Sequence, residues 1–145
     1  MFNRMLAAVK DWRPAFKQIA ADFYKVEKQQ FETQGSRKSA WEALSPKYAL
    51  YKNRHFPGKK ILERTGELKK SLTTASGVDS VYVETYQELR VGAESKVGSW
   101  HQHGVPEDVG SRMPARRPMD LTPKDKSRWV KYMHEFMAHA ARKQG

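Results

Sequence analysis

The sequence predicts an α+β domain in which long N-terminal and C-terminal helices pack on a small antiparallel β-sheet, with long basic loops between the elements. Three observations predict it. Apolar residues recur at helical spacing near both ends of the chain. Between these regions, apolar and polar residues alternate for a short stretch. The 145 residues suit one domain with a modest core, so we expect a single domain over residues 1–145.

The N-terminal region predicts a helix that is interrupted once. From Phe2 to about Gln34, most apolar residues are three or four positions apart. Pro14 interrupts this pattern, and proline is tolerated in the first turn of a helix but not in its interior. We therefore expect a short helix, a break near Trp12, and a long helix that ends before Gly35.

Two shorter helices are expected next. Ser45 has the character of an N-cap, and the proline after it suits the first position of a helix over Pro46–Asn53. Thr65 is expected to cap the following helix, which has Glu67 in its first turn.

The middle of the chain predicts a β-hairpin. Val81 and Val83 are two residues apart, as are Leu89 and Val91, with polar residues between them. A turn near Tyr86-Gln87 would join the two strands. We expect all four apolar side chains to lie on one buried face.

The last helix has the clearest start signal. Thr122 is expected as its N-cap, Pro123 as its first residue and Asp125 as the carboxylate that completes a capping box. The apolar stripe that follows consists of Trp129, Met133, Phe136, Met137 and Ala140.

Composition narrows the classes of function. There is no cysteine, which excludes disulfides and thiolate metal sites. No apolar run approaches the roughly 20 residues of a membrane span, and the N-terminus has no signal-peptide core, so we expect no membrane contact and a cytoplasmic chain. The net charge of +11 favours an anionic partner such as nucleic acid or an acidic protein surface.

The sequence indicates no enzyme. Its 16 carboxylates form no catalytic motif, and its serines lie in caps or loops without a nucleophile elbow or a phosphate-binding glycine loop. We therefore predict no catalytic residue and no cofactor.

Two histidine pairs are candidates for metal ligands. His134 and His139 are five residues apart, which puts them about 140° apart around a helix and too far for one ion. His101 and His103 would share a face if the chain there were extended, and a metal-dependent enzyme built on this pair stays as one alternative. Two ligands are fewer than a metal site needs, so we predict no metal site.

A second alternative is a basic module that binds nucleic acid. Cations in the region after Gly35 are interleaved with aromatic residues, a mixture that suits phosphate contacts and base stacking. No helix-turn-helix, zinc-finger or RNA-recognition signature supports this, and Trp41, Tyr48 and Tyr51 also fit the buried stripe of a short helix. The cations of this basic region are Arg37, Lys38, Lys47, Lys52, Arg54, Lys59 and Lys60.

Four motifs in order resemble one known family. They are WEALSPKYALYK, ILERTGELKKSL, HQHG and MPARRPMDLTPKD, and the matching region runs from about Phe31 to Asp125. This resembles the phage virion morphogenesis family, also called tail completion proteins. The resemblance implies a single tail-completion-like domain over residues 1–145 that acts without catalysis.

The resemblance also implies a location and partners. Such a chain would be a ring-forming structural subunit of the virion, at the head-proximal end of the tail, and would assemble in the host cytoplasm. Its partners would be copies of itself and the tail tube, tail terminator or neck and connector proteins. Non-specific contact with DNA in the conduit is a further expectation.

Among the residues expected at the assembly interface, Arg116 and Arg117 stand in the stiff segment between Pro114 and Pro118. Adjacent side chains on an extended chain point to opposite faces. We therefore predict that one arginine binds within the subunit, to carboxylates or carbonyls, and that the other faces a neighbour. The other residues predicted at the interface are Pro114, Trp41, His101 and His103.

Overall fold

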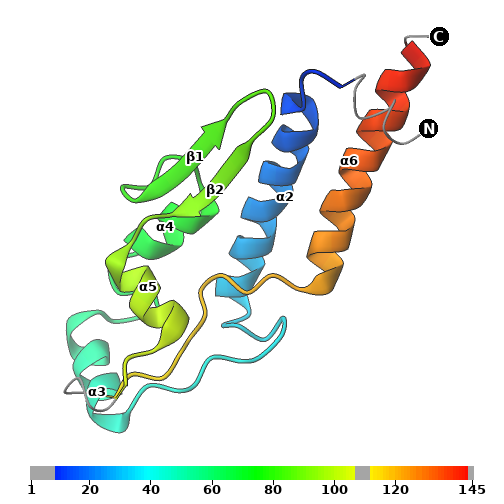
Figure 1. The fold of residues 1–145 in the computed structure, drawn as a ribbon. Coiled ribbons are helices and arrows are strands. Elements are labelled where there is room, and N and C mark those ends of the chain that lie inside the picture. Colours follow the sequence, from blue (N-terminus) through cyan, green and yellow to red (C-terminus); the bar gives the residue numbers. More distant parts are fainter. Residues whose placement is uncertain (1–8, 107–111, 144–145) are drawn as a thin grey trace.

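A computed structural model of the chain describes residues 9–106 and 112–143. It confirms the α+β prediction. Five helices and one two-stranded antiparallel sheet are found in the described residues. In chain order they are α2 (Arg13–Glu32), α3 (Pro46–His55), α4 (Glu67–Thr73), β1 (Ser80–Glu84), β2 (Leu89–Ala93), α5 (Lys96–His103) and α6 (Pro123–Lys143) (Figure 1).

The central helix α2 begins and ends where the sequence predicts. Pro14 lies in its first turn, where the missing N–H costs nothing. After the helix the chain reverses at Gly35, whose φ of 86° favours glycine. A Cβ on Gly35 would lie 2.5 Å from the ring of Trp41, so a larger residue does not fit this corner. The short helix predicted ahead of α2 falls mostly on residues 1–8, outside the described residues.

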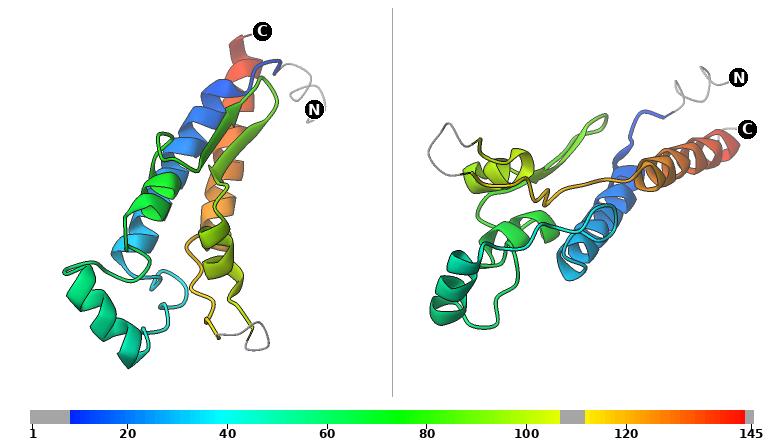
Figure 2. Two further views of the ribbon diagram at one scale, coloured as in Figure 1. Left: turned by 90° about the vertical axis from the view of Figure 1, so that its left-hand side faces the viewer. Right: turned by 90° about the horizontal axis from the view of Figure 1, so that it is seen from below.

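The C-terminal helix α6 lies alongside α2, and α2 lies between α6 and the hairpin (Figures 1 and 2). The predicted capping box is present. The Asp125 N–H donates to Thr122 Oγ1 over 3.2 Å, and the Thr122 N–H donates to Asp125 Oδ2 over 2.8 Å. The apolar stripe of α6 packs on the first half of α2, in a cluster formed by Val9, Trp12, Ala15, Phe16, Ile19, Trp129, Tyr132, Met133, Phe136, Met137 and Ala140.

The hairpin is found at the predicted place. Its strands pair from Ser80 with Ala93 to Glu84 with Leu89. The connection closes with a hydrogen bond of 2.8 Å from the Thr85 N–H to the carbonyl of Glu88.

The prediction of one apolar face on the hairpin is wrong. Val81 lies opposite Gly92 and Val83 opposite Arg90, and directly opposed residues share a face of a sheet. A turn with an even number of residues places odd-numbered positions of one strand against even-numbered positions of the other. Val91 therefore packs inward on the core, whereas Val81 and Val83 lie on the opposite face.

Helix α4 completes a second apolar cluster against the other half of α2. Its N-cap is Gly66, in the left-handed region at φ 85°, and not Thr65 as predicted. The Thr65 hydroxyl still accepts a long hydrogen bond of 3.4 Å from the Glu67 N–H. The cluster contains Phe23, Phe31, Trp41 and Leu72, with Tyr24, Ile61, Leu62, Leu68, Val91, Ala93, Leu121 and Trp129 packed against them.

Helix α5 contains the HQH segment, for which the sequence analysis assigned no helix. The Ser95 hydroxyl caps it by accepting a hydrogen bond of 3.2 Å from the Gly98 N–H. A Cβ on Gly98 would lie 3.0 Å from the side chain of Leu68 in α4, so this glycine allows a close approach of the two helices. The contact with α4 thus favours a helix in a segment whose intrinsic helix propensity is low.

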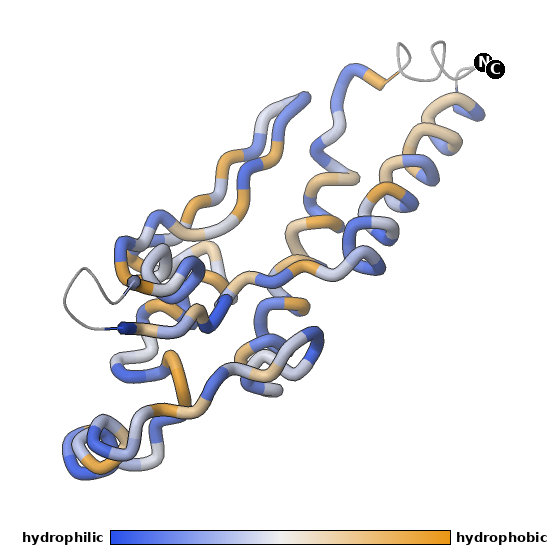
Figure 3. Tube along the Cα trace, turned by 60° about the horizontal axis from the view of Figure 1, so that its bottom comes forward, coloured by the Kyte–Doolittle hydropathy of each residue, from blue (hydrophilic) through white to orange (hydrophobic). Residues whose placement is uncertain are grey.

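Helix α3 stands apart at one end of the molecule, joined to the rest by two long connections (Figures 1 and 2). It starts at the predicted residue, with the Ser45 hydroxyl accepting from the Tyr48 N–H over 3.4 Å, and it ends two residues later than predicted, at His55. No helix within residues 9–106 and 112–143 is both long and apolar enough to cross a bilayer. Hydrophilic residues recur along α2 and α6 (Figure 3).

Candidate assembly surface

The segment Met113–Met119, here called the strap, connects two distant parts of the chain. It runs from a β-bridge between Met113 and Val105 to the approach of α6. The Arg116 N–H donates to the carbonyl of His101 over 2.8 Å. The Gln102 amide donates to the carbonyl of Met119 over 2.9 Å. The C-terminal turn of α5 therefore holds the strap along most of its length.

Arg116 lies inside the molecule and ties the strap to the segment before α3. Its side chain belongs to a residue that is only 6% exposed. The guanidinium donates to the carbonyl of Glu42 over 2.5 Å and to the carbonyl of Ala43 over 2.8 Å. Burial lowers the pKa of Arg116, but the ordinary value of an arginine is so high that the group stays charged. The predicted internal tie through carbonyls is thus confirmed for Arg116.

Arg117 has the opposite arrangement, with an anchored backbone and an exposed side chain. Its carbonyl accepts hydrogen bonds from Trp41 Nε1 over 2.9 Å and from Gln30 Nε2 over 3.1 Å. Trp41 and Gln30 therefore hold the Arg117 backbone in place, and the Arg117 side chain lies at the surface. That this guanidinium meets a neighbouring subunit stays a prediction.

Trp41 belongs to the core of the single chain, and its place at an interface stays a prediction. The residue is 8% exposed, and its ring packs edge-on against Phe31 with centroids 5.4 Å apart. With its indole N–H bound to the strap, the side chain has both its apolar and its polar contacts inside the chain. Pro114 is half-buried within the strap.

The two histidines of HQH do not share a face, which corrects the expectation from an extended chain. Positions i and i+2 of a helix lie about 160° apart, so His101 and His103 point to different sides of α5. In the part of the chain that the structure describes, no group of three or more potential ligands is found. The two histidines therefore cannot act together on one ion from this helix.

His101 lies in a basic interior. Its ring is half-buried, and Nδ1 is buried without a hydrogen-bond partner. Burial lowers the pKa of His101, and the nearby charges of Arg116 and Lys52 lower this pKa further. His101 is thus neutral at neutral pH. His103 is exposed, with Nδ1 3.0 Å from the Ser99 carbonyl.

The basic region is less free than the sequence indicates, because three of its seven cations bind within the chain. Arg37 forms an ion pair of 2.9 Å with Asp125, and Lys38 forms one of 3.0 Å with Asp120. Lys52 is buried and donates to the carbonyl of Lys60. The exposed cations of the set are Lys47, Arg54, Lys59 and Lys60.

Helix α3 presents an apolar and aromatic surface, although the spacing of Tyr48 and Tyr51 also fitted a buried stripe. Leu50 is 73% exposed and Tyr51 is 48% exposed. The Tyr48 and Tyr51 rings stack at 6.0 Å, and the His55 ring lies 4.4 Å from that of Tyr51. A periodic apolar stripe on a helix does not reveal whether another part of the same chain covers it.

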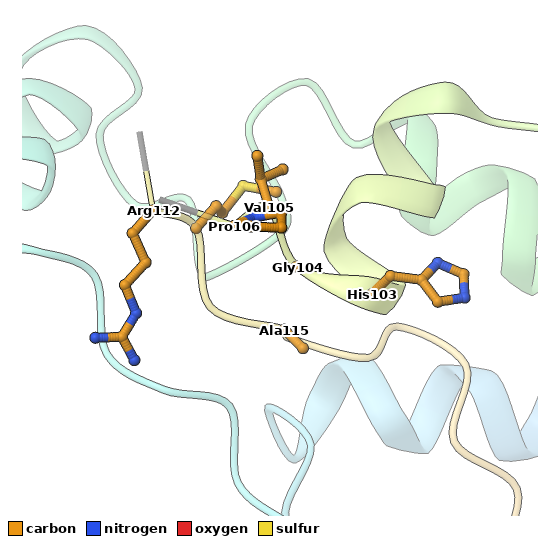
Figure 4. A pocket seen from close by; sticks show the side chains of 7 residues that line it. His103, Gly104, Val105, Pro106, Arg112 and Ala115 are labelled. Atoms are coloured by element: carbon orange, nitrogen blue, oxygen red, sulfur yellow. The ribbon is translucent and has the colours of Figure 1, made fainter. Parts of the chain in front are cut away.

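A depression open to solvent lies where α5 meets the strap (Figure 4). Arg112 is the cationic side chain of its described lining, and His103 stands at its edge. This lining combines no nucleophile with a base that could activate it. The lining residues are His103, Gly104, Val105, Pro106, Arg112, Met113 and Ala115.

A layer of buried polar side chains joins the start of α6 to α2 and to the loop that follows α2. Asp125 accepts from Arg37 Nη2 at 2.9 Å and from Arg128 Nη2 at 2.9 Å. Burial by itself would raise the pKa of Asp125, but hydrogen bonds from Thr122, Arg37 and Arg128 outweigh it and hold the pKa well below its usual range.

Glu27 of α2 is the unusual member of this layer. It is fully buried, and neither carboxyl oxygen has a hydrogen-bond partner. Burial raises the pKa of Glu27 to about 8, with Arg37 opposing the rise and Asp125 and Asp120 adding to it. Glu27 is therefore mostly protonated at neutral pH.

Comparison with known proteins gives one match. The model of the phage virion morphogenesis family matches residues 1–138 of the chain. No curated protein and no solved structure matches the chain.

Proposed function

Because the chain belongs to the phage virion morphogenesis family, we propose that it completes the phage tail at its head-proximal end. Copies of the chain form a ring there and join the tail to the neck. The role is structural, and no catalytic step is part of it.

The single observation that carries this proposal beyond the family is the strap. The backbone of the strap is hydrogen-bonded to α5. The Arg116 guanidinium binds the carbonyls of Glu42 and Ala43. The exposed Arg117 side chain is carried on this fixed backbone. A backbone held in place before binding loses less conformational entropy on contact with a partner, which suits an assembly joint.

The partners under this proposal are of two kinds. Neighbouring copies of the chain complete the ring. The tail tube, the tail terminator or the neck and connector proteins meet its two rims, and DNA in the conduit is touched through exposed lysines and arginines without sequence preference.

The test is deletion of the gene from a phage that carries it, with electron microscopy of the lysate. We expect separate filled heads and finished tails, and joined particles when the wild-type gene is supplied on a plasmid. Fully joined and infectious particles in its absence would overturn the proposal.

A basic nucleic-acid-binding module is the second candidate. Lys47, Arg54, Lys59 and Lys60 are exposed on the same end of the molecule as Tyr48 and Tyr51. Four phosphate contacts would make log K fall with log salt at a slope of about −4. A DNA titration that stays flat at moderate salt removes this candidate without affecting the first.

A further inference from the structure

We propose, on the premise of the ring above, that α3 of one copy docks on the outer face of the hairpin of the next copy. The arm is defined here as residues 46–60. The hairpin patch is defined as the exposed side of residues 77–94. The two differ in charge, both carry exposed apolar side chains, and they lie in different parts of the molecule.

The charges of the two surfaces are complementary. The arm carries five lysines and arginines and no carboxylate. The hairpin segment carries four carboxylates and one arginine, in a chain whose net charge is +11. The five cations of the arm are Lys47, Lys52, Arg54, Lys59 and Lys60, and the four carboxylates are Asp79, Glu84, Glu88 and Glu94.

Most of these charges remain available to a neighbour. Of the arm cations, Lys52 is buried, and the other four are exposed. Of the hairpin carboxylates, Glu94 is exposed, and Glu88 forms a pair with Arg90 in which both side chains are more than half exposed. Glu84 lies opposite Leu89, on the other face of the hairpin, and accepts from the Tyr82 hydroxyl. Exposed pairs of this kind are worth little, so they exchange partners readily.

Both surfaces also have an apolar part. On the arm it consists of Tyr48, Leu50 and Tyr51. On the hairpin it consists of Val81 and Val83, which the strand register turns away from the core, beside the exposed Val78 and Tyr86. An apolar centre with a charged rim is the usual composition of a specific protein interface.

The two surfaces cannot meet within one copy. Figure 1 places α3 at one end of the molecule and the turn of the hairpin near the other, with α4 and α5 between them. A contact between different patches of identical chains is heterologous, and it closes into a ring when the rotation between neighbours allows. This contact therefore produces the type of assembly that the proposed function requires.

The arm is fixed before docking. The Lys52 ammonium binds the carbonyl of Lys60, which closes the loop after α3. The Arg116 guanidinium holds the carbonyls of Glu42 and Ala43, just before α3 begins. The position of the arm is thus set by buried contacts, and its exposed side chains are left for the neighbour.

Cross-linking tests the contact directly, because the chain has no cysteine of its own. Leu50→Cys on the arm and Val83→Cys on the hairpin, combined in one chain and treated with a short bismaleimide, should give a ladder of dimers, trimers and larger species. Each single variant alone should stay monomeric on a denaturing gel. An equal mixture of the two single variants should give dimers and nothing larger.

The matched control replaces the hairpin position by one on α6. Leu50→Cys with Val130→Cys, both at exposed positions, should give no ladder. Equal ladders from the control and the test pair, or none from the test pair, would overturn the proposed contact.

Charge reversal provides a second test on folded protein. Lys47→Glu with Arg54→Glu on the arm should abolish self-association in sedimentation, and so should Glu88→Lys with Glu94→Lys on the hairpin. A mixture of the two variants should associate again, because the intact arm of one fits the intact hairpin of the other and the two reversed surfaces are again opposite in charge. Circular dichroism and thermal unfolding confirm that each variant is folded.

Outcomes for the contact and for the proposed function are separable. A monomeric wild-type chain at every concentration, or variants that assemble like the wild type, would overturn the contact even if gene deletion leaves heads and tails unjoined. Joined particles after deletion, together with the expected ladder, would overturn the tail-joining function and leave the contact standing.

Discussion

At the scale of single residues, two adjacent arginines have opposite surroundings. Arg116 is enclosed by backbone carbonyls, whereas Arg117 is anchored by its own carbonyl and exposes its side chain. Alternation along an extended backbone explains the division, because neighbouring side chains leave the chain in opposite directions. One residue therefore contributes mainly to the free energy of folding, and the other is available for assembly.

The first prediction follows from this division. Arg116→Ala should lower the free energy of unfolding by about 2–3 kcal/mol, because the carbonyls of Glu42 and Ala43 lose a charged donor in a buried place. The matched control, Arg117→Ala, should change it by less than about 0.5 kcal/mol. Urea denaturation measures both. In plasmid complementation, Arg117→Ala should still reduce the fraction of joined particles. Equal losses of stability in both variants would contradict the division.

The second prediction concerns pH and Glu27. Its pKa is raised in the folded state to about 8, so the folded chain holds a proton that the unfolded chain releases above about pH 4. This group therefore destabilises the fold progressively as pH rises from about 4 to 8, and its unfavourable effect is complete above that range.

The variant Glu27→Gln removes this titration. Its unfolding free energy should match that of the wild type at pH 5 to within about 1 kcal/mol and exceed it by about 5 kcal/mol at pH 9. Urea denaturation of both proteins across this range gives the difference. A difference that does not change with pH would show that Glu27 is not protonated in the fold.

At the scale of elements, the start of α6 combines a local signal with distant contacts. Thr122 and Asp125 form the capping box that the sequence predicts. The same carboxylate binds Arg37, which lies 88 positions earlier in the chain, and Arg128 one turn further on. The cap thus also joins α6 to the loop after α2.

The third prediction is that Asp125→Asn lowers the free energy of unfolding by about 3 kcal/mol, because Arg37 loses its buried partner.

The pKa of Asp125 is held low in the fold, so its stabilising effect is complete above the unfolded pKa of about 4 and is lost as the pH falls below it. The free energy of unfolding of the wild type should therefore fall more steeply than that of the variant as the pH drops below about 4. The exposed pair variant Glu135→Gln serves as the control and should change stability by less than about 0.5 kcal/mol.

At the scale of the whole molecule, the proposed ring contact joins exposed charges of opposite sign. Salt should weaken it, because the Debye length falls from about 10 Å at 0.1 M to less than half of that at 1 M. The fourth prediction is that self-association measured by sedimentation weakens at least about tenfold between these salt concentrations. Thermal stability of the monomer should change far less, since the buried pairs Arg37–Asp125 and Arg128–Asp22 are less accessible to ions. Association that strengthens with salt would point to an apolar contact alone.

Much of the fold follows from the sequence, because the signals involved are local. Pro14, the Thr122 cap and the alternation around Val91 each act within one or two turns of chain. The order of motifs likewise indicated the family that the comparison with family models later showed. The sequence predicts the candidate site less well than the fold, because the site depends on contacts between distant segments. Trp41 is enclosed by the core, and the helical form of α5 depends on the approach of Leu68 to Gly98.

The sequence by itself determined the α+β class, the places of the hairpin and the long helices, the capped start of α6 and the excess of positive charge. Only the tertiary structure decided which cations are free. Arg37, Lys52 and Arg116 bind carboxylates or carbonyls that are distant in the chain or across a loop, and composition cannot anticipate such partners. The tertiary structure also decided that Arg116 is enclosed and Arg117 is exposed. Alternation separates the two side chains, but burial depends on the segments that fold against the strap.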